Sequence, residues 1–252
     1  MIGTGRFAGL VPLVFVLFWA GGYAFAKLGL RHAEPMTLLA LRYGLALVAL
    51  APFLARRGIS WPQDMRHWAA LALTGLLIQG LYFGLAYLAM KRGMSAGTTA
   101  LIMALQPLLV AAAAPLMGKA RATVWVWAGL VLGFLGLVLV IASGDSLGPS
   151  PGIAVLFACM ALLGITAATL FEGWHGLRCD PAVGGVVQYA VGFALLLPVA
   201  LLSEGMAFDW HPELGVALAY LALGNSIIAV GLYIAMLQQG DATRISALLY
   251  LV

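Results

Sequence analysis

The chain has 252 residues, of which 63% are hydrophobic and 9% charged, and its mean hydropathy is +1.04. A soluble domain carries about 25% charged residues, so this composition excludes a soluble enzyme, a nucleic-acid-binding module and a disordered chain. The net charge of +4 comes from cations scattered singly or in pairs between apolar runs, where Lys and Arg set the orientation of membrane helices.

Eight apolar stretches follow one another along the chain, each near the length of about 20 residues that a helix needs to cross a bilayer. The short connections between them, such as 144–151, leave no room for an extramembrane domain. The sequence therefore predicts an all-α polytopic membrane protein with spans at 9–28, 36–55, 68–90, 96–117, 124–142, 152–172, 182–202 and 214–237.

The first apolar run and the last apolar stretch differ from the other spans. Arg6, the first apolar run and Ala24-Phe25-Ala26 mimic a cleavable signal peptide, but the run is longer than a typical signal core. We therefore expect it to be the first span. A ninth stretch, 243–252, holds ten residues, which rise only about 15 Å as a helix. We expect the sequence to stop inside a ninth helix.

The distribution of Lys and Arg predicts a cytoplasmic N-terminus in a cell inner membrane. With that orientation the outer loops carry four cations: Lys27, Arg31, Lys91 and Arg92. The inner loops carry eight: Arg6, Arg56, Arg57, Arg66, Lys119, Arg121, Arg178 and Arg244.

Prolines and a tyrosine of the second span recur in the seventh. Adding 146 to Pro35, Arg42, Tyr43 and Pro52 gives Pro181, Gln188, Tyr189 and Pro198. Adding 147 to Gly84, Gly93, Ala100 and Leu101 gives Gly231, Gly240, Ala247 and Leu248. Because five helices is an odd number, the second copy must enter the membrane from the opposite side, as in transporters with inverted repeats. We predict repeats of five helices at 1–143 and 152–252, the second truncated within its fourth helix, with ten helices expected and about eight and a half present.

The chain resembles the EamA-type members of the drug/metabolite transporter superfamily along its whole length. The resemblance rests on Trp19-Ala20-Gly21, Lys27, Pro35, Leu41-Arg42-Tyr43, Leu105-Gln106-Pro107, Gly129 with Gly136, and the segment 246–252. It implies ten helices in two inverted repeats, both termini in the cytoplasm, and transport of small molecules, often export. One departure is Gly118-Lys119, where the family commonly has Gly-Glu.

The most polar residues of four spans fall at the span centres. These residues are Trp19, Gln79, Gln106 and the pair Asn225-Ser226. Polar groups at this depth either line a transport path or hold helices together. Amides, a hydroxyl and an indole at one depth favour a central cavity for a small polar substrate, with interhelical hydrogen bonding as the structural alternative. Tyr82 lies one helical turn from Gln79, and Tyr233 lies two turns from Asn225. Each therefore either lines the same cavity or packs between helices.

Arg42 is a charge well inside a span, seven residues after Pro35 and therefore about 10 Å deep. Such a cation is by default a gate or an anchor for a substrate carboxylate, and the alternative is that it snorkels to the outer interface. We count Gln188, its counterpart in the second repeat, with the site. Lys27 and Glu172 lie near span ends, where we expect them at the interface.

Two prolines and several glycines punctuate the spans. Pro107 and Pro198 remove backbone hydrogen bonds, so the freed carbonyls could line a cavity or act as hinges. Gly80-x-x-x-Gly84 and Gly129-x-x-x-Gly133 favour close helix packing. His32, His67, His175 and His211 fall in loops or at span edges, where we expect solvated side chains.

Several kinds of chemistry lack a candidate motif. The sequence contains no phosphate-binding Gly-x-x-x-x-Gly-Lys loop and no zinc-binding or nucleophile motif. Cys159 and Cys179 have no spacing that predicts a metal site or a disulfide. No carboxylate occupies the middle of a span, so a proton relay has no candidate. We therefore expect no cofactor, no metal and no enzymatic activity.

The sequence predicts a secondary transporter, more readily an exporter, of small organic metabolites or drugs, working by alternating access. The alternatives are an intramembrane lipid-modifying enzyme and a membrane partner protein without transport. The expected partners are the small-molecule substrate and the lipid bilayer, with a homodimer left open and no nucleic acid.

Overall fold

A computed structural model describes residues 11–54, 61–62, 64–113, 115, 123–143, 152–175 and 179–237. In these ranges the chain is helical apart from turns and one isolated bridge between Ala33 and Phe208. Each of the eight predicted spans is helical in its described part, apart from a turn at residues 104–105 of the fourth. The single-segment helices are α1 (Val11–Gly29), α2 (Pro35–Leu54), α7 (Val124–Ser143) and α8 (Gly152–His175).

The other four spans are built from two or three helical segments each. The third comprises α3 (Met65–Gly75), η1 (Leu76–Tyr82) and α4 (Phe83–Lys91), and the fourth α5 (Ala96–Met103) and α6 (Gln106–Ala113). The seventh comprises α9 (Pro181–Val199) and η3 (Ala200–Glu204), and the eighth α10 (Pro212–Ala219), η4 (Tyr220–Ala229) and α11 (Val230–Leu237). The segments labelled η are π-helices.

Six helical stretches in the described ranges are long and apolar enough to cross a membrane. They are Pro35–Leu54, Met65–Lys91, Ala96–Ala113, Gly152–His175, Pro181–Glu204 and Pro212–Tyr233, while the apolar helix Leu13–Gly29 is shorter. The prediction of an all-α polytopic membrane protein is therefore confirmed. The ninth stretch 243–252, Gly118-Lys119 and most of the inner-loop cations lie outside the described residues.

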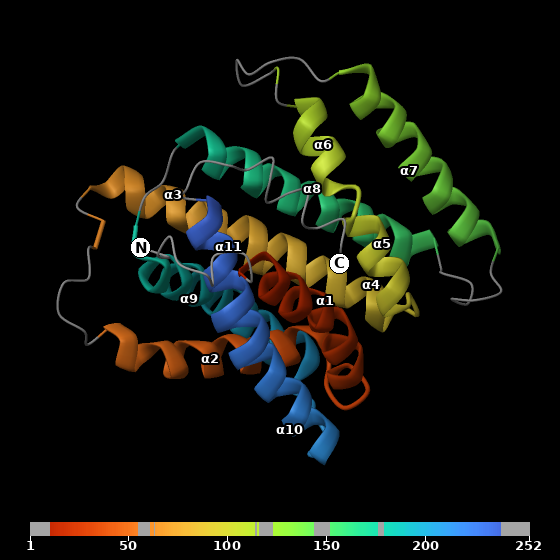
Figure 1. The fold of residues 1–252 in the computed structure, drawn as a ribbon. Helices are drawn as coiled ribbons and strands as arrows, with labels where there is room; N and C mark the ends of the chain where they lie inside the picture. Colours follow the sequence, from red (N-terminus) through yellow and green to blue (C-terminus); the bar gives the residue numbers. More distant parts are fainter. Residues whose placement is uncertain are drawn as a thin grey trace.

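Helices from the two predicted repeats pack against each other rather than forming separate bundles (Figure 1). The most extensive contact joins α2 to α9, the second helix of each repeat. α1 packs along η4 and α10, and η1 and α4 pack along α8. α7 lies at the edge of the bundle against α5 and α6 (Figure 1). Residues at one level of the bundle can therefore come from both repeats.

The two long π-helices occupy equivalent places in the predicted repeats. η1 contains Gln79 and η4 contains its counterpart Ser226. The Tyr43 hydroxyl donates to the Gln79 carbonyl at 2.8 Å, and the Tyr189 hydroxyl donates to the Ser226 carbonyl at 2.6 Å. A π-helix disturbs the regular ladder of backbone hydrogen bonds, and in a membrane the carbonyls concerned need other donors. These two equivalent contacts agree with the offset of the repeat, whose boundaries stay a prediction.

Pro107 coincides with a break in the fourth span. α5 ends at Met103 and α6 begins at Gln106, with a turn at residues 104–105. Because Pro107 cannot donate to the preceding turn, the break places the Gln106 side chain at the start of a new helix. Pro198 lies within α9, just before η3.

Glycines allow the closest helix contacts, but unequally. A Cβ added at Gly75 would lie 2.9 Å from the Cα of Gln188, so α3 and α9 touch there by their backbones. An added Cβ at Gly80 would lie 2.7 Å from Leu195, whereas one at Gly84 would meet nothing within 4 Å. The predicted packing role therefore holds for Gly80 and not for Gly84.

The N-terminus of α3 is capped outside the membrane-spanning segment. The Asp64 carboxylate accepts from the backbone N–H of His67 at 2.8 Å and contacts its imidazole at 2.6 Å. The backbone N–H and then the imidazole hold the pKa of Asp64 below its usual value. The cap fixes where the third span begins.

Candidate substrate-binding site

Arg42 occupies the centre of the contact between α2 and η4. Its side chain is fully buried rather than extended towards the interface. Nε donates to the Ser226 hydroxyl at 2.9 Å, Nη2 donates to the Asn225 side-chain carbonyl at 2.6 Å, and Nη1 donates to the Tyr87 hydroxyl at 3.0 Å. The guanidinium also lies 4.2 Å from the centre of the Phe83 ring. Arg42 thus joins predicted site residues of the eighth span to two aromatic residues of the third.

A small aromatic cavity borders these contacts. Its volume is about 10 Å³, and it is lined by Trp19, Gly22, Tyr23, Tyr82, Phe83, Ala86, Tyr87 and Asn225. The Tyr23 and Tyr82 hydroxyls share a hydrogen bond of 2.8 Å across it. A volume of about 10 Å³ holds at most one water molecule, so this conformation is closed to an organic substrate.

Asn225 is fixed from both sides. Its side-chain N–H donates to the Phe18 carbonyl of α1 at 3.1 Å, while its side-chain carbonyl receives Arg42. A Cβ added at Gly22 would lie 2.4 Å from the same side-chain nitrogen. A glycine is therefore required at position 22 for Asn225 to reach the α1 backbone.

A second polar group lies beside the aromatic cavity. The Gln106 side-chain N–H donates to the Thr169 hydroxyl at 2.8 Å, and that hydroxyl shares a hydrogen bond of 2.7 Å with Tyr233. The Tyr233 ring lies 5.4 Å from the Trp19 ring, centre to centre. Trp19 therefore stands between the cavity on one side and the Gln106 group on the other.

Three buried glutamine side chains have unused polar atoms. Within the described residues, both amide atoms of Gln79 and the carbonyl oxygens of Gln106 and Gln188 have no hydrogen-bond partner. Gln188 donates at 3.4 Å to Glu172, which is partly buried. An unpaired buried polar atom is costly, so these three positions are suited to receive water or a polar ligand.

The structure divides the predicted site residues into three places. Trp19, Tyr82 and Asn225 line the cavity with Arg42 and Ser226 beside it; Gln106 and Tyr233 form the second group; Gln79 and Gln188 stand apart. The sequence reasoning missed Tyr23, Phe83, Tyr87 and Thr169. The spacing of four residues from Trp19 to Tyr23, and again from Phe83 to Tyr87, puts each pair on one helix face and could have indicated them.

One end of the bundle, where α1 turns into α2, is held together by polar contacts. Lys91 pairs with Glu34 at 2.9 Å, and the Lys27 ammonium donates to the carbonyls of Met90 and Met94. Glu204 accepts from the backbone N–H groups of Met36 and Thr37. We call these contacts, with the His32–Glu213 pair described next, the end latch. The latch connects the first, second, third, seventh and eighth spans.

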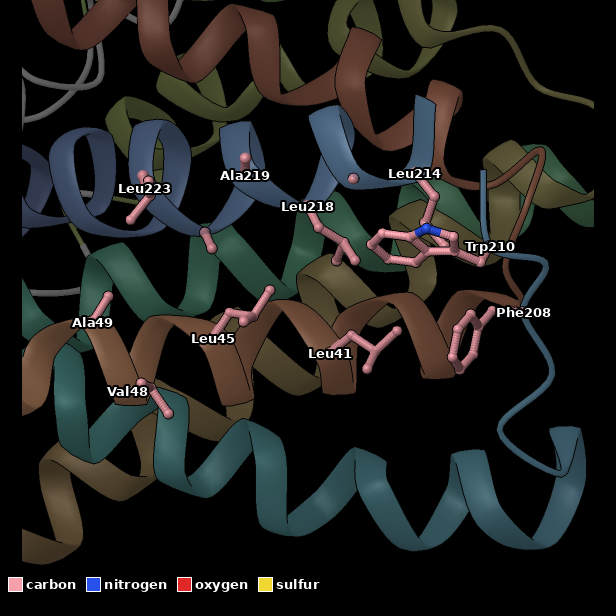
Figure 2. Close-up of a pocket in the computed structure, with 12 residues that line it drawn as sticks. Leu41, Leu45, Val48, Ala49, Phe208, Trp210, Leu214, Leu218, Ala219 and Leu223 are labelled. Atoms are coloured by element: carbon pink, nitrogen blue, oxygen red, sulfur yellow. The ribbon is translucent and has the colours of Figure 1, made fainter. Parts of the chain in front are cut away.

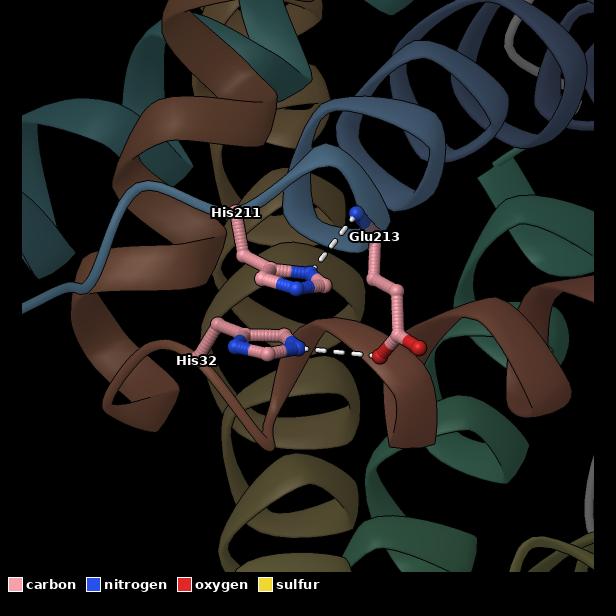
Figure 3. Close-up of side chains that lie close together, drawn as sticks. All are labelled: His32, His211 and Glu213. Atoms are coloured by element: carbon pink, nitrogen blue, oxygen red, sulfur yellow. Dashed lines mark hydrogen bonds and ion pairs between the residues drawn. The ribbon is translucent and has the colours of Figure 1, made fainter.

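His32, His211 and Glu213 form the most compact part of the latch (Figure 3). His32 Nε2 lies 2.9 Å from Glu213 Oε2, and the two imidazole rings stack 4.5 Å apart at 6° from parallel. One potential ligand atom of each residue lies within 4.8 Å of the others. Nitrogen lone pairs lie in the ring plane, so parallel stacked rings do not direct them at one ion. The arrangement suits a hydrogen bond between the turn after α1 and the first turn of α10, which differs from the solvated His32 that we expected.

A larger apolar groove of about 580 Å³ lies between α2 and the α10–η4 stretch (Figure 2). Its wall carries Leu41, Leu45, Val48, Trp210, Leu218 and Leu223 among others, and Val48 and Trp210 are 72% and 75% exposed. A wall of this kind offers a polar substrate almost no hydrogen-bonding group. The groove is open to the surroundings of the bundle, whereas the polar side chains of the candidate site described above lie in the interior of the bundle.

Comparison with known proteins identifies relatives of the whole chain. The EamA-like transporter family matches residues 6–142. The inner membrane transporter YedA of Escherichia coli K12 is 29% identical over 244 residues, which cover 92% of this chain and 76% of the relative. A transporter of Archaeoglobus fulgidus is 28% identical over 96% of this chain and 84% of its own.

Two further likenesses extend this finding. A protein of Salmonella typhimurium named "Probable amino-acid metabolite efflux pump" is 27% identical over 97% of this chain and 82% of its own. A solved crystal structure superposes with a TM-score of 0.72 at 20% identity, over 96% of this chain and 82% of that one. The second likeness shows that the fold occurs in an experimentally determined protein.

Proposed function

Since the chain belongs to the EamA-like transporter family, we propose that it is a secondary transporter that moves small organic metabolites or drugs across the cell inner membrane. The observation that carries this proposal is the set of hydrogen bonds from Arg42 on α2 to Asn225 and Ser226 on η4. These bonds join the two predicted repeats beside an enclosed aromatic cavity. Transporters built from inverted repeats place their substrate at such a junction.

The mechanism we propose is alternating access. A cavity of about 10 Å³ cannot hold an organic molecule, so the substrate must enter after the two repeats rock apart at one end. The end latch would hold one end closed while the other opens. Its salt bridge between Lys91 and Glu34 and the contact between His32 and Glu213 are partly exposed, and such pairs are weak enough to break in each cycle.

The direction and orientation belong to the same proposal. A relative's name describes an efflux pump, which supports export. The excess of Lys and Arg in the loops on the side of the N-terminus supports a cytoplasmic N-terminus. A cysteine introduced near position 31 should then react with a membrane-impermeant thiol reagent added outside the cell.

Counterflow of labelled substrate in proteoliposomes tests transport directly. Vesicles loaded with an unlabelled metabolite should accumulate the same labelled metabolite faster than protein-free vesicles. Failure across a panel of amino acids, nucleosides and amphipathic drugs would refute transport. Lipids recovered from the same vesicles should be chemically unchanged, since modified lipids would favour the enzyme alternative.

Two variants and one control test the site. Gln79→Ala and Asn225→Ala should weaken substrate affinity, because both side chains are buried within the contact between the repeats. Both variants should still fold. Gly84→Ala adds a methyl group in open space and should exchange substrate as the unaltered protein does. Unchanged kinetics in both site variants would remove these residues from the site.

A further inference from the structure

Arg42 is a buried cation with only neutral partners among the described residues. Its hydrogen bonds go to a serine hydroxyl, an amide carbonyl and a tyrosine hydroxyl, and its nearest ring is that of Phe83. None of the ion pairs in the described ranges involves Arg42. A buried charge is strongly disfavoured unless an opposite charge accompanies it. Among the described residues, therefore, Arg42 has no anionic partner.

The guanidinium has donors to offer such an anion. It carries five N–H groups in a planar fork, and the described contacts use one on each nitrogen. One N–H on each terminal nitrogen is left. These two N–H groups can donate to a carboxylate.

The residues around Arg42 indicate what the rest of the ligand is like. Three of the four groups that contact the guanidinium, on Phe83, Tyr87 and Asn225, also line the aromatic cavity. The remaining wall is formed mainly by the rings of Trp19, Tyr23 and Tyr82. Rings of this kind bind an apolar or aromatic body, and none of the described residues that line the cavity carries a carboxylate that would attract an ammonium.

Given the transport function proposed above, we infer that the substrate is an organic anion whose carboxylate pairs with Arg42 and whose apolar or aromatic body enters the cavity of Trp19, Tyr23 and Tyr82. The carboxylate supplies the missing counter-charge. The small size of the cavity in the present conformation means that the anion binds when the two repeats have moved apart. The substrate therefore neutralises a buried charge that has no counter-charge among the described residues.

Binding of matched ligands to the purified unaltered protein tests the inference without any mutation. The probes are phenylacetate, indole-3-acetate and 4-methylpentanoate, each compared with its primary amide, which has nearly the same shape and no charge. At least one acid should raise the melting temperature and bind about tenfold or more tightly than its amide, since loss of one partner of a buried charge pair is costly. Amides that bind as well as the acids, or no binding by any acid, would overturn it.

Variants then assign the preference to Arg42. Arg42→Gln should abolish the preference for acid over amide, whereas Arg42→Lys should keep the charge and part of the preference while losing the planar arrangement of donors. Arg92→Gln removes an exposed cation outside the cavity and should leave the preference unchanged. If Arg42 only joined helices, its variants would lower the melting temperature and leave the ratio of acid to amide affinity unaltered.

Counterflow with the same probes separates this inference from the proposed function. Exchange of phenethylamine or of the amides without exchange of any acid would support the proposed transport and refute the inferred anionic substrate. Binding of an acid without exchange of any probe would support the inferred anion site and refute the proposed transport. Should the Arg42 variants fail to fold, the acid-to-amide ratio of the unaltered protein still decides.

Discussion

The paired tyrosine contacts with the two π-helices make the sharpest stability prediction. Tyr43→Phe removes the hydroxyl that donates to the Gln79 carbonyl at 2.8 Å, and Tyr189→Phe removes the one that donates to the Ser226 carbonyl at 2.6 Å. Both tyrosines are fully buried, and phenylalanine fills nearly the same volume. Each substitution therefore isolates one hydrogen bond to a π-helical carbonyl.

The size of the effect follows from what replaces the bond. Hydrogen bonds between membrane helices average about 0.6 kcal/mol and reach about 1.7 kcal/mol, while a buried acceptor left unpaired costs about 1–3 kcal/mol. Because Gln79 and Ser226 are buried, we expect each variant to lose about 1–2 kcal/mol. In a chain of this length that corresponds to a fall in melting temperature of roughly 2–8 °C. Because the two contacts are equivalent, the two losses should match.

Thermal unfolding in mild detergent, followed by intrinsic fluorescence, measures these shifts. The control is Tyr220→Phe, whose partly exposed hydroxyl makes two longer contacts of 3.2 and 3.4 Å and should change the melting temperature little. Melting of Tyr43→Phe and Tyr189→Phe at the temperature of the unaltered protein would refute the view that the π-helices need these donors. A larger loss in the Tyr220 variant would do the same.

Three further changes test packing, site geometry and pH dependence. Gly75→Ala should be about 1–3 kcal/mol less stable than Gly84→Ala in detergent unfolding, since both gain helix propensity but only the first strikes a facing backbone. Gly22→Ala should weaken substrate affinity in counterflow by displacing the Asn225 side chain. The Asp64 carboxylate, whose pKa the fold lowers, should stabilise the protein fully above its unfolded pKa of about 3.9 and lose that effect as the pH falls through the lower folded value. The melting temperature should thus fall less between about pH 5 and about pH 3 in Asp64→Asn than in the unaltered protein. Asparagine keeps the helix cap but does not titrate.

The sequence predicted the eight helices because membrane insertion is decided segment by segment. A run of about 20 apolar residues satisfies its own backbone hydrogen bonds as a helix, whatever its neighbours are. Short cues added Pro107 as a point where the helix loses a backbone hydrogen bond and Arg42 as a charge inside a span. These predictions needed no knowledge of which helices touch.

The grouping of the site residues could not be predicted in the same way. From helical spacing we expected Tyr82 to share a face with Gln79, yet Tyr82 lines the cavity while Gln79 packs near Gly192 of α9. Both residues lie in η1, where hydrogen bonds run from i to i+5 and each turn holds more residues than in an α-helix. Residues three apart therefore no longer stand one above the other.

Composition, hydropathy and punctuation by themselves determined that this is a helical membrane protein, and they predicted Trp19 and Asn225 at the centres of their spans and Arg42 about 10 Å deep. Only the tertiary structure decided that Arg42 meets Asn225, Ser226 and Tyr87 with no carboxylate among the described partners. Depth is a property of one segment in lipid. The partner of a side chain depends on how each helix is rotated, and one added residue turns the following face by about 100°. That rotation is fixed by packing between segments far apart in the chain.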